Sequence, residues 1–485
     1  MISRYDLVVI GGGTAGLVSA AGGASLGAKV ALIERDKLGG DCLHTGCVPT
    51  KTLVKSARVA KLINTSEEFG IKSGDMEVDF PAVMDRMRGV IEKAGEADDP
   101  NRFRNLGVDV FLGSEASFVS PEEIQVDGGR LRAASSIIAT GSHAVAPPIT
   151  GLEEVGYLTN IEALSLDRLP KSLTIVGSGP IGCEFAQIFA RFGCDVAMMD
   201  MVEMPLAKED PEMRAEILHC LQSDGVSFYG GFTAEEARLE DGEKVISATN
   251  ERGENMELRA EEILIAAGRA PTVESLALES AGVRLEKTGI PVDELMRTSA
   301  PNIYAAGDIT GEFLFTHVAE YQGRIALRNA LFPIKTRANY RVVPWTTFTD
   351  PEVARVGMTE DEAREKYGSD VRVYRKEFAD VDRAMADGET AGLAKIVTTK
   401  KGRILGGHIT GPDAGNLIHE VVLAMQKNIP IQILSTTIHV YPTLAQVNQR
   451  VADEYYREKL FSGPAAKVFS TFFAARRKVR EWRRP

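Results

Sequence analysis

The stretch YDLVVIGGGTAGLVSA, residues 5–20, carries the strongest indication of the fold. Its apolar residues predict a buried strand, which runs into a Gly-x-Gly-x-x-Gly turn and then a helix of small residues. Such a turn lets the backbone approach a pyrophosphate at a helix N-terminus. We therefore expect Gly11, Gly13 and Gly16 to bind a dinucleotide. Glu34, after the next strand, is expected to bind a ribose hydroxyl.

The pattern occurs again as SLTIVGSGPIGCEFAQ, residues 172–187, with the turn glycines Gly177, Gly179 and Gly182. In both copies an acidic residue lies 23 positions beyond the first glycine, and in the second copy it is Asp200. One such motif is weak evidence, whereas two copies in the same register predict two dinucleotide-binding domains.

The segment after Asp200 bears on which nicotinamide cofactor is used. Residues 201–207 contain Glu203 and no Lys or Arg, so a 2′-phosphate would meet carboxylates there. The sequence therefore favours NADH over NADPH.

Three shorter segments predict how the two folds are connected. SSIIATGS (135–142) and EEILIAAGR (261–269) are strands that end in small residues and glycine, and NIYAAGDIT (302–310) is a third. The second fold is therefore expected to be inserted into the first. The predicted class is α/β, with two nested dinucleotide-binding (Rossmann-like) domains and a C-terminal α+β domain. The expected ranges are 1–148 and 275–344 for the first fold, 149–274 for the second, 345–464 for the C-terminal domain and 465–485 for a basic tail.

Composition limits the function classes. The net charge of −12 argues against nucleic acid as a partner. No apolar run reaches the length of a membrane span, and the first strand starts at Leu7, which leaves no room for a signal peptide. A cytoplasmic location is therefore expected.

Two of the five cysteines, Cys42 and Cys47, lie in GGDCLHTGCVPTK (39–51). Their spacing can close a small disulfide loop, Val48-Pro49 suits the start of a helix, and a thiol near a helix N-terminus ionises more easily. A redox-active disulfide is favoured, with a metal pair or a chance spacing as alternatives. Because no second Cys/His cluster has metal-ligand spacing, no metal site is predicted. The other cysteines are expected to be buried thiols: Cys183, Cys194 and Cys220.

Together these motifs resemble the FAD-dependent pyridine nucleotide–disulfide oxidoreductases, which include dihydrolipoyl dehydrogenase, glutathione reductase and mercuric reductase. The resemblance rests on GGDCLHTGCVPTK, the doubled turn, ATG, AAGRAP and YAAGD, and it covers residues 5–460 in the family's order. VPWTTFTDPEVARVG (343–357) is most similar to the mercuric reductase branch. The resemblance implies FAD in the first fold and a homodimer in which the C-terminal domain completes the partner's active site.

The resemblance also implies residue roles. NADH would pass a hydride to the flavin, Cys47 would be the thiol beside the flavin, and Cys42 the thiol that exchanges with substrate. Lys51 is similar to the family's lysine near the flavin N5, and Glu184 to its ion-pair partner. The other implied cofactor contacts are Thr140, Gly141, Gly268, Gly307 and Asp308.

The segment IHVYPTLAQ (438–446) aligns with the motif in which dihydrolipoyl dehydrogenase has a histidine base and a glutamate that orients it. Here the residues at those positions are Tyr441 and Gln446. A tyrosine with a pKa near ~10 is a poor base at neutral pH, and glutamine carries no charge. Mercuric reductase has a tyrosine at the matching place, and Hg(II) needs thiolates more than a proton shuttle.

Three histidines have open roles. His439 is either a substitute acid/base or a packed or interface residue. His44, between the two cysteines, is a second candidate proton donor, and His317 is expected to support the flavin motif.

The predicted function is hydride transfer from NADH through FAD to a Cys42–Cys47 disulfide and on to a small disulfide or thiol acceptor. The alternatives are a thiol-bound metal ion as acceptor, as in mercuric reductase, and a quinone reduced directly by the flavin. The C-terminal sequence VREWRRP lacks the paired cysteines of mercuric reductase, and no metal-binding domain precedes Tyr5. A transhydrogenase-like or partner-binding flavoprotein is a further alternative, but relatives of that kind lack the complete cysteine pair.

The tail from Ala465 onward contains seven basic residues and one acidic residue. At helical period its apolar residues fall near one face, although Arg476 and Arg483 lie inside that arc, and the opposite face carries Arg477, Lys478 and Arg484. The apolar residues are Val468, Phe469, Phe472, Phe473, Val479 and Trp482. One interpretation of the tail is a helix that lies peripherally on the anionic inner face of the membrane. The other is a dimer-packing or frayed terminal helix.

Overall fold

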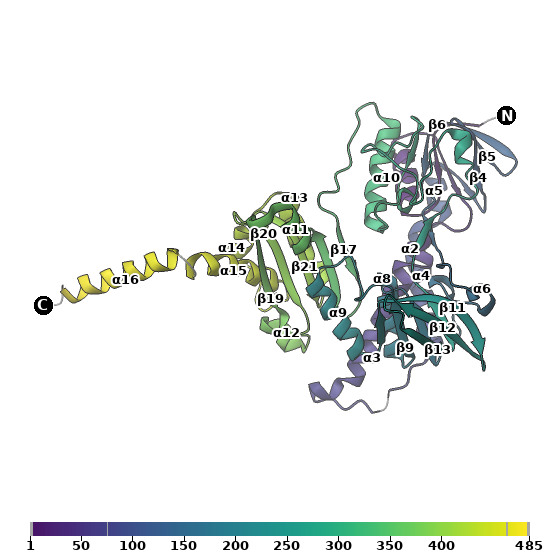
Figure 1. Ribbon diagram of the computed structural model, residues 1–485. Coiled ribbons are helices and arrows are strands. Elements are labelled where there is room, and N and C mark those ends of the chain that lie inside the picture. Colours follow the sequence, from purple (N-terminus) through teal and green to yellow (C-terminus); the bar gives the residue numbers. More distant parts are fainter. Residues whose placement is uncertain (1–2, 75, 462–463, 483–485) are drawn as a thin grey trace. The chain divides into compact units, whose positions relative to one another are not determined.

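The computed structural model describes residues 3–74, 76–461 and 464–482 as a mixed α/β protein, which confirms the predicted fold class (Figure 1). The chain forms two compact units. Unit 1 consists of Met1–Glu203 and Asp224–Tyr340, and unit 2 of Met204–Ser223 and Arg341–Pro485. Both dinucleotide motifs lie in unit 1. The finer domain boundaries remain predictions.

The first dinucleotide motif belongs to a seven-stranded sheet in the order β3-β2-β1-β6-β5-β4, in which β16 pairs with β6. The strands are β1 (Ser3–Ile10), β2 (Val30–Glu34), β3 (Val108–Leu112), β4 (Ala116–Ser120), β5 (Glu123–Val126), β6 (Gly129–Ile138) and β16 (Ile303–Ala305). β1 pairs in parallel with β2 and β6, and β16 in parallel with β6. Because parallel strands end at the same edge, the turns after β1, β6 and β16 lie close together.

The second motif belongs to a parallel sheet in the order β10-β9-β8-β14. Its strands are β8 (Ser172–Val176), β9 (Asp195–Asp200), β10 (Ser227–Gly230) and β14 (Glu262–Ile265). An antiparallel sheet follows β10: β11 (Phe232–Glu240), β12 (Glu243–Asn250) and β13 (Asn255–Ala260). The pair β7 (Ser142–Ala144) and β15 (Arg269–Pro271) joins the segments that leave and re-enter the first fold.

Helices pack on these sheets and carry the candidate site residues. In Figure 1, α10 lies beside β6 and α8 lies near β9. The helices of unit 1 are α1 (Thr14–Ser25), α2 (Gly40–His44), α3 (Cys47–Asn64), α4 (Phe80–Gly95), α5 (Pro100–Asn105), α6 (Leu152–Val155), α7 (Asn160–Ala163), α8 (Pro180–Phe192) and α10 (Thr316–Leu331). Both predicted small-residue helices are present as α1 and α8, which confirms that part of the repeat.

Unit 2 is built on an antiparallel sheet in the order β17-β18-β21-β20-β19. The strands are β17 (Pro344–Thr347), β18 (Glu352–Gly357), β19 (Val371–Glu377), β20 (Leu393–Thr399) and β21 (Ile404–Gly411). The helices are α9 (Pro211–Ser223), α11 (Glu360–Tyr367), α12 (Asp382–Asp387), α13 (Ala414–Gln426), α14 (Ile431–Thr436), α15 (Gln446–Phe461) and α16 (Pro464–Trp482). This sheet with its helices has the α+β character that the sequence predicts for the C-terminal part of the chain.

One face of this sheet carries a row of polar residues that holds the start of α9. Trp345, Arg355, His408, Lys395 and Arg375 are register partners across the five strands. Trp345 Nε1 donates to Glu209 (2.6 Å), Lys395 pairs with Asp210 (2.9 Å) and Arg375 with Glu212 (2.7 Å). Burial lowers the pKa of His408, which lies between two cations, to about 4. These ion pairs explain why the segment Met204–Ser223 belongs to unit 2.

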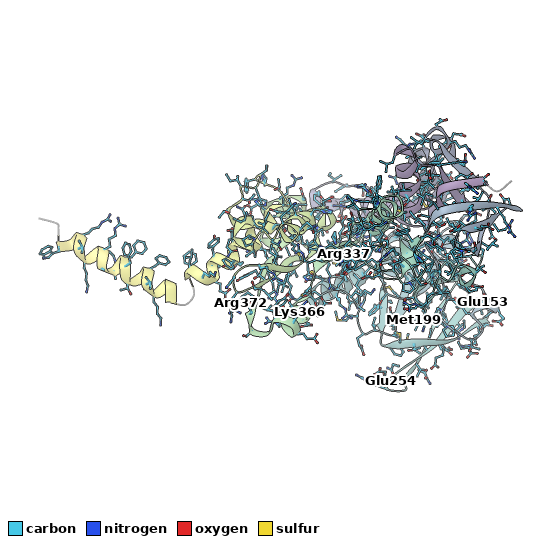
Figure 2. The ribbon with its side chains drawn as sticks, turned by 90° about the horizontal axis from the view of Figure 1, so that it is seen from above. Glu153, Met199, Glu254, Arg337, Lys366 and Arg372 are labelled. Carbon is cyan, nitrogen blue, oxygen red and sulfur yellow. The ribbon has the colours of Figure 1, made fainter. Side chains whose placement is uncertain are left out.

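The described part of the basic tail is helical, as α16, which agrees with both interpretations of the tail. Figure 2 shows side chains standing out from α16 along its length. Arg483 and Arg484 lie outside the described residues. Within the described part of the chain, no helix combines the length and apolar character needed to cross a bilayer.

Candidate active site

The first dinucleotide turn has the geometry that its glycines predict. Gly11 has φ +107°, and a Cβ there would lie 2.3 Å from the Ala139 carbonyl oxygen. At Gly16 a Cβ would lie 1.8 Å from the Gly11 carbonyl oxygen. Gly13 differs, because its Cβ would meet nothing closer than the Cα of Gly40, at 4.0 Å. Packing therefore requires two of the glycines, while the middle one leaves room for a ligand.

The second turn repeats this geometry. Gly177 has φ +108° and a Cβ position 2.6 Å from the Ala266 carbonyl oxygen, and at Gly182 a Cβ would be 2.0 Å from the Gly177 carbonyl oxygen. At Gly179 a Cβ would meet no atom within 4 Å. The close approach of backbone to a pyrophosphate is a physical reason for glycine at such an open position.

The acidic residue after each motif is also in an equivalent place. Gly12 N donates to Glu34 Oε2, and Ser178 N donates to Asp200 Oδ2, both at 2.6 Å. A carboxylate has about four lone-pair sites, so each can still accept from a ribose hydroxyl. The residues present therefore fit a dinucleotide in each fold.

The turns after β6 and β16 meet near the first dinucleotide turn. Thr140 Oγ1 donates to the Thr272 carbonyl (2.7 Å), and Gly141 has φ +69°. Asp308 follows Gly307, and its Oδ2 accepts from Ser142 Oγ at 2.8 Å. Burial raises the pKa of Asp308, and the Ser142 hydrogen bond opposes this effect.

Gly268, the last of the implied cofactor glycines, lies where β14 leads into β15. Its carbonyl accepts from Val145 N at 3.2 Å. Beside it, Arg269 donates to Ser142 Oγ (2.9 Å) and to Asp41 Oδ2 (2.7 Å), which ties this connection to the cysteine segment. Sequence reasoning missed this pair.

The cysteine segment packs directly on the first turn. A Cβ at Gly40 would lie 2.8 Å from the Gly13 Cα, so the start of α2 is placed against the turn. Cys42 lies in α2 and Cys47 is the first residue of α3. Both thiols are free, with Cys42 half-buried and Cys47 exposed.

The two thiols differ in their protonation. Cys42 donates a hydrogen bond to Cys47, and this contact is the largest cause of a Cys47 pKa lowered to about 6. Thr316 and the charge of Lys51 lower it further, while burial opposes them. The same hydrogen bond raises the pKa of Cys42, since ionised Cys42 would have no proton to share. The start of α3 also favours a thiolate at Cys47.

Lys51 and Glu184 form an ion pair between α3 and α8, with Nζ 2.8 Å from Oε2 and 3.0 Å from Oε1. Glu184 is 4% exposed. Buried carboxylates of this kind are retained only when paired. The pair therefore connects α3, which begins at Cys47, with α8, the helix of the second dinucleotide turn.

The three histidines are placed as follows. His44 Nε2 faces the Leu38 carbonyl at 2.9 Å, and the His317 ring stacks on Phe315 at 5.5 Å. His439 Nδ1 faces the Thr437 carbonyl (3.0 Å), and its Nε2 faces Glu420 (3.1 Å). Both ring nitrogens of His439 thus face oxygen acceptors, so acid/base work by His439 would require breaking one of these contacts. Its catalytic role stays a prediction.

On either side of His439, which is itself only partly exposed, residues 438, 440 and 441 are exposed. Tyr441, the first residue that the motif alignment singled out, is 65% exposed, and Ile438 is 96% exposed. Asn448 Nδ2 also donates to Glu420 (3.0 Å). Sequence reasoning missed Glu420, which lies in α13 far from the motif. The three cysteines expected to be buried, Cys183, Cys194 and Cys220, are buried.

Thr316, the first residue of α10, is a second residue that sequence reasoning missed. Its Oγ1 lies 3.5 Å from the Cys47 Sγ. The nearest sequence signal was one position away, at His317.

The two dinucleotide folds and the cysteine pair define an FAD- and pyridine-nucleotide-dependent oxidoreductase. Residues 5–323 match the pyridine nucleotide-disulphide oxidoreductase family, and residues 343–452 match the dimerisation domain of the same family. The chain belongs to this family, which uses FAD and NAD(P)H. The dimerisation domain indicates a homodimer.

Relatives come from two enzyme groups. The chain is 35% identical to a mercuric reductase of Bacillus cereus over 91% of its own length and 70% of that protein. It is also 35% identical to a dihydrolipoyl dehydrogenase of Chlamydia muridarum, over 92% and 96%. Among solved structures it is similar to the HOCl-induced flavoprotein disulfide reductase RclA of Escherichia coli, with TM-score 0.83, 31% identity and coverage of 93% and 99%. A Cu(II) complex of RclA is similar to the same extent, with TM-score 0.83 and 30% identity.

Proposed function

We propose that the Cys42–Cys47 pair is the redox-active disulfide of this enzyme, and that NADH is the electron donor. When bound, FAD supplies the two-electron carrier between NADH and the sulfurs. In net terms, one hydride equivalent converts the disulfide into one thiol and one thiolate. The proton of that hydride remains on Cys42, and Cys47 holds the negative charge.

The observation that carries the proposal is the placement of the two sulfurs: Cys42 lies in α2, Cys47 is the first residue of α3, and Thr316 Oγ1 lies 3.5 Å from the Cys47 sulfur. Cys42 donates to Cys47, whose pKa of about 6 leaves it ionised at neutral pH. A pair with this arrangement takes up a hydride equivalent without an external proton.

The remaining cofactor residues have assigned roles in the same proposal. The FAD contacts are Gly11, Gly13, Gly16, Glu34, Lys51, Thr140, Gly141, Gly307 and Asp308. The NADH contacts are Gly177, Gly179, Gly182, Asp200 and Gly268. Asp200 already accepts from Ser178 N and Oγ. Glu203 follows it three positions later in the chain, and residues 201–207 contain no Lys or Arg for a 2′-phosphate.

For the acceptor we propose a soft metal ion bound through the thiolates. A disulfide acceptor needs two protons as well as two electrons, whereas Hg(II) needs only the electrons to become Hg(0). Tyr441 and Gln446 replace the family's acid/base pair, and both nitrogens of His439 are engaged. The mercuric reductase relatives support this choice.

NADH oxidation by the holoenzyme, measured with Hg(II), lipoamide and a quinone, tests the proposal. Cys42→Ser should abolish Hg(II)-dependent turnover, and the control Cys194→Ala, at a buried thiol, should leave it intact. Retained Hg(II) turnover in Cys42→Ser would contradict the proposal. The second candidate is a quinone reductase. It would be identified if Cys42→Ser keeps quinone turnover and the wild type shows no turnover with Hg(II).

The specific observation that favours this second candidate is α16. Its apolar side chains are exposed, with Val468 at 65% and Trp482 at 89%. The described basic residues of the helix are Lys467, Arg476, Arg477, Lys478 and Arg480. Exposed aromatic residues interleaved with cations match an anionic lipid surface, and we propose that residues 465–485 bind one peripherally.

Co-sedimentation with vesicles tests this contact. The full chain should bind phosphatidylglycerol-containing vesicles and not pure phosphatidylcholine vesicles, and salt should weaken the binding. Deletion of 465–485 should abolish it, and equal sedimentation of the deleted chain would refute the contact. The same deletion should leave Hg(II) turnover unchanged, since the tail carries none of the cysteines.

A further inference from the structure

Two helix N-termini meet at the sulfur of Cys47. Cys47 is the first residue of α3 and Thr316 is the first residue of α10, with Thr316 Oγ1 at 3.5 Å from the sulfur. Backbone N–H groups at a helix N-terminus carry partial positive charge, which stabilises an anion. The hydroxyl of Thr316 adds a donor that can point at this anion.

The position of Thr316 is fixed by the packing of α10. A Cβ at Gly323 in α10 would lie 2.7 Å from the Ala15 carbonyl oxygen in α1, so the two helices are in close contact. Ser19 Oγ of α1 also donates to the Gly323 carbonyl, at 3.2 Å. The helix that carries Thr316 is therefore held against the helix of the first dinucleotide turn.

We propose that Thr316 is a positioning residue that keeps Cys47 as a thiolate by donating a hydrogen bond to its sulfur. The hydroxyl is also within hydrogen-bonding reach of Cys42, but it has one proton to give. The negative charge on Cys47 attracts that proton, so Cys47 receives hydrogen bonds from both Cys42 and Thr316. This inference rests on the proposed redox pair and adds to it a donor outside the cysteine segment.

Alkylation of Cys47 in the reduced holoenzyme by iodoacetamide, followed by peptide mass spectrometry across pH, tests the inference. Only the thiolate reacts, so the midpoint of the rate profile reports the Cys47 pKa, about 6 in wild type. Thr316→Val removes the donor and should raise the midpoint by about one pH unit. At a pH below the midpoint, the fraction of thiolate should then be about tenfold smaller. Thr316→Ser should restore the wild-type midpoint.

Thr52→Val is the matched control, because Thr52 Oγ1 donates only to the Val48 carbonyl (2.8 Å) within α3. It should leave the midpoint unchanged, and FAD content should be equal in all variants. An unshifted midpoint in Thr316→Val overturns the inference. This outcome is distinct from failure of the redox pair, which would instead appear as full Hg(II) turnover in Cys42→Ser.

Discussion

The two dinucleotide turns share a backbone geometry but differ in what packs on them. In the first turn Gly40 of the cysteine segment lies against Gly13, whereas nothing lies within 4 Å of a Cβ at Gly179 in the second. In the proposed assignment, the first turn therefore contacts a cofactor and also places Cys42, whereas the second contacts a cofactor alone. The same Gly-x-Gly-x-x-Gly pattern would thus have two functions in the first fold and one in the second.

The largest expected effect comes from the glycines that packing requires in both turns. Gly16→Ala and Gly182→Ala place a Cβ 1.8 Å and 2.0 Å from a backbone carbonyl oxygen, and backbone cannot move aside cheaply. Each should lower the free energy of unfolding by at least about 3 kcal/mol, or prevent folding. Urea denaturation measures this.

The control is Gly89→Ala in α4, where a Cβ would meet no atom within 4 Å. This substitution should raise stability by about 1 kcal/mol, because alanine favours a helix more than glycine does. Equal stability of the Gly16→Ala and Gly89→Ala proteins would show that the turn tolerates a side chain.

Substitutions at the middle glycine of each turn, Gly13 and Gly179, should affect different cofactors. Gly13→Ala should fold but lose FAD, whereas Gly179→Ala should retain FAD and raise the KM for NADH by at least about tenfold, a loss of roughly 1.4 kcal/mol. The ratio of flavin to protein absorbance and steady-state kinetics report these effects. A Gly179→Ala protein without FAD would break the assignment of the second turn to the nicotinamide cofactor.

The repeat made most of this fold predictable from sequence. The spacing from Gly11 to Glu34 and from Gly177 to Asp200 places each acid beside its turn, because strand, turn and helix have fixed lengths. The cysteine pair was predictable for a similar reason, since Cys42, Cys47 and Lys51 lie on one short segment.

Contacts between distant segments were not predictable in this way. Thr316 reaches Cys47 only because α10 packs on α1, and Glu420 reaches His439 from α13, whereas His439 lies in the loop between α14 and α15. The ion pair of Lys395 with Asp210 depends on strand register in a sheet that carries no motif. Such contacts arise from tertiary packing, to which local periodicity gives no access.

A smaller effect is expected at Glu203, three positions beyond the acidic residue of the second turn, Asp200. Glu203→Arg would offer a 2′-phosphate a cation in place of a carboxylate, so the ratio of kcat/KM for NADPH to that for NADH should rise by about tenfold. The first turn does not contact the nicotinamide cofactor in this proposal, so the FAD content of Glu203→Arg should not change. An unchanged ratio would show that Asp200 alone sets the preference.

The smallest effect concerns the ion pair of Lys51 and Glu184, which joins α3 to α8. Lys51 lowers the pKa of Cys47 and Glu184 raises it, so neutralising each should shift that pKa in opposite directions. Lys51→Met should move the alkylation midpoint of Cys47 upward and Glu184→Gln should move it downward, each by about half a unit, because these two charges are the smallest causes of the Cys47 pKa shift. Shifts of the same sign would mean that the pair acts through the packing of α3 on α8. In that case α8 would influence the Cys47 sulfur through its packing on α3 rather than through the charge of Glu184.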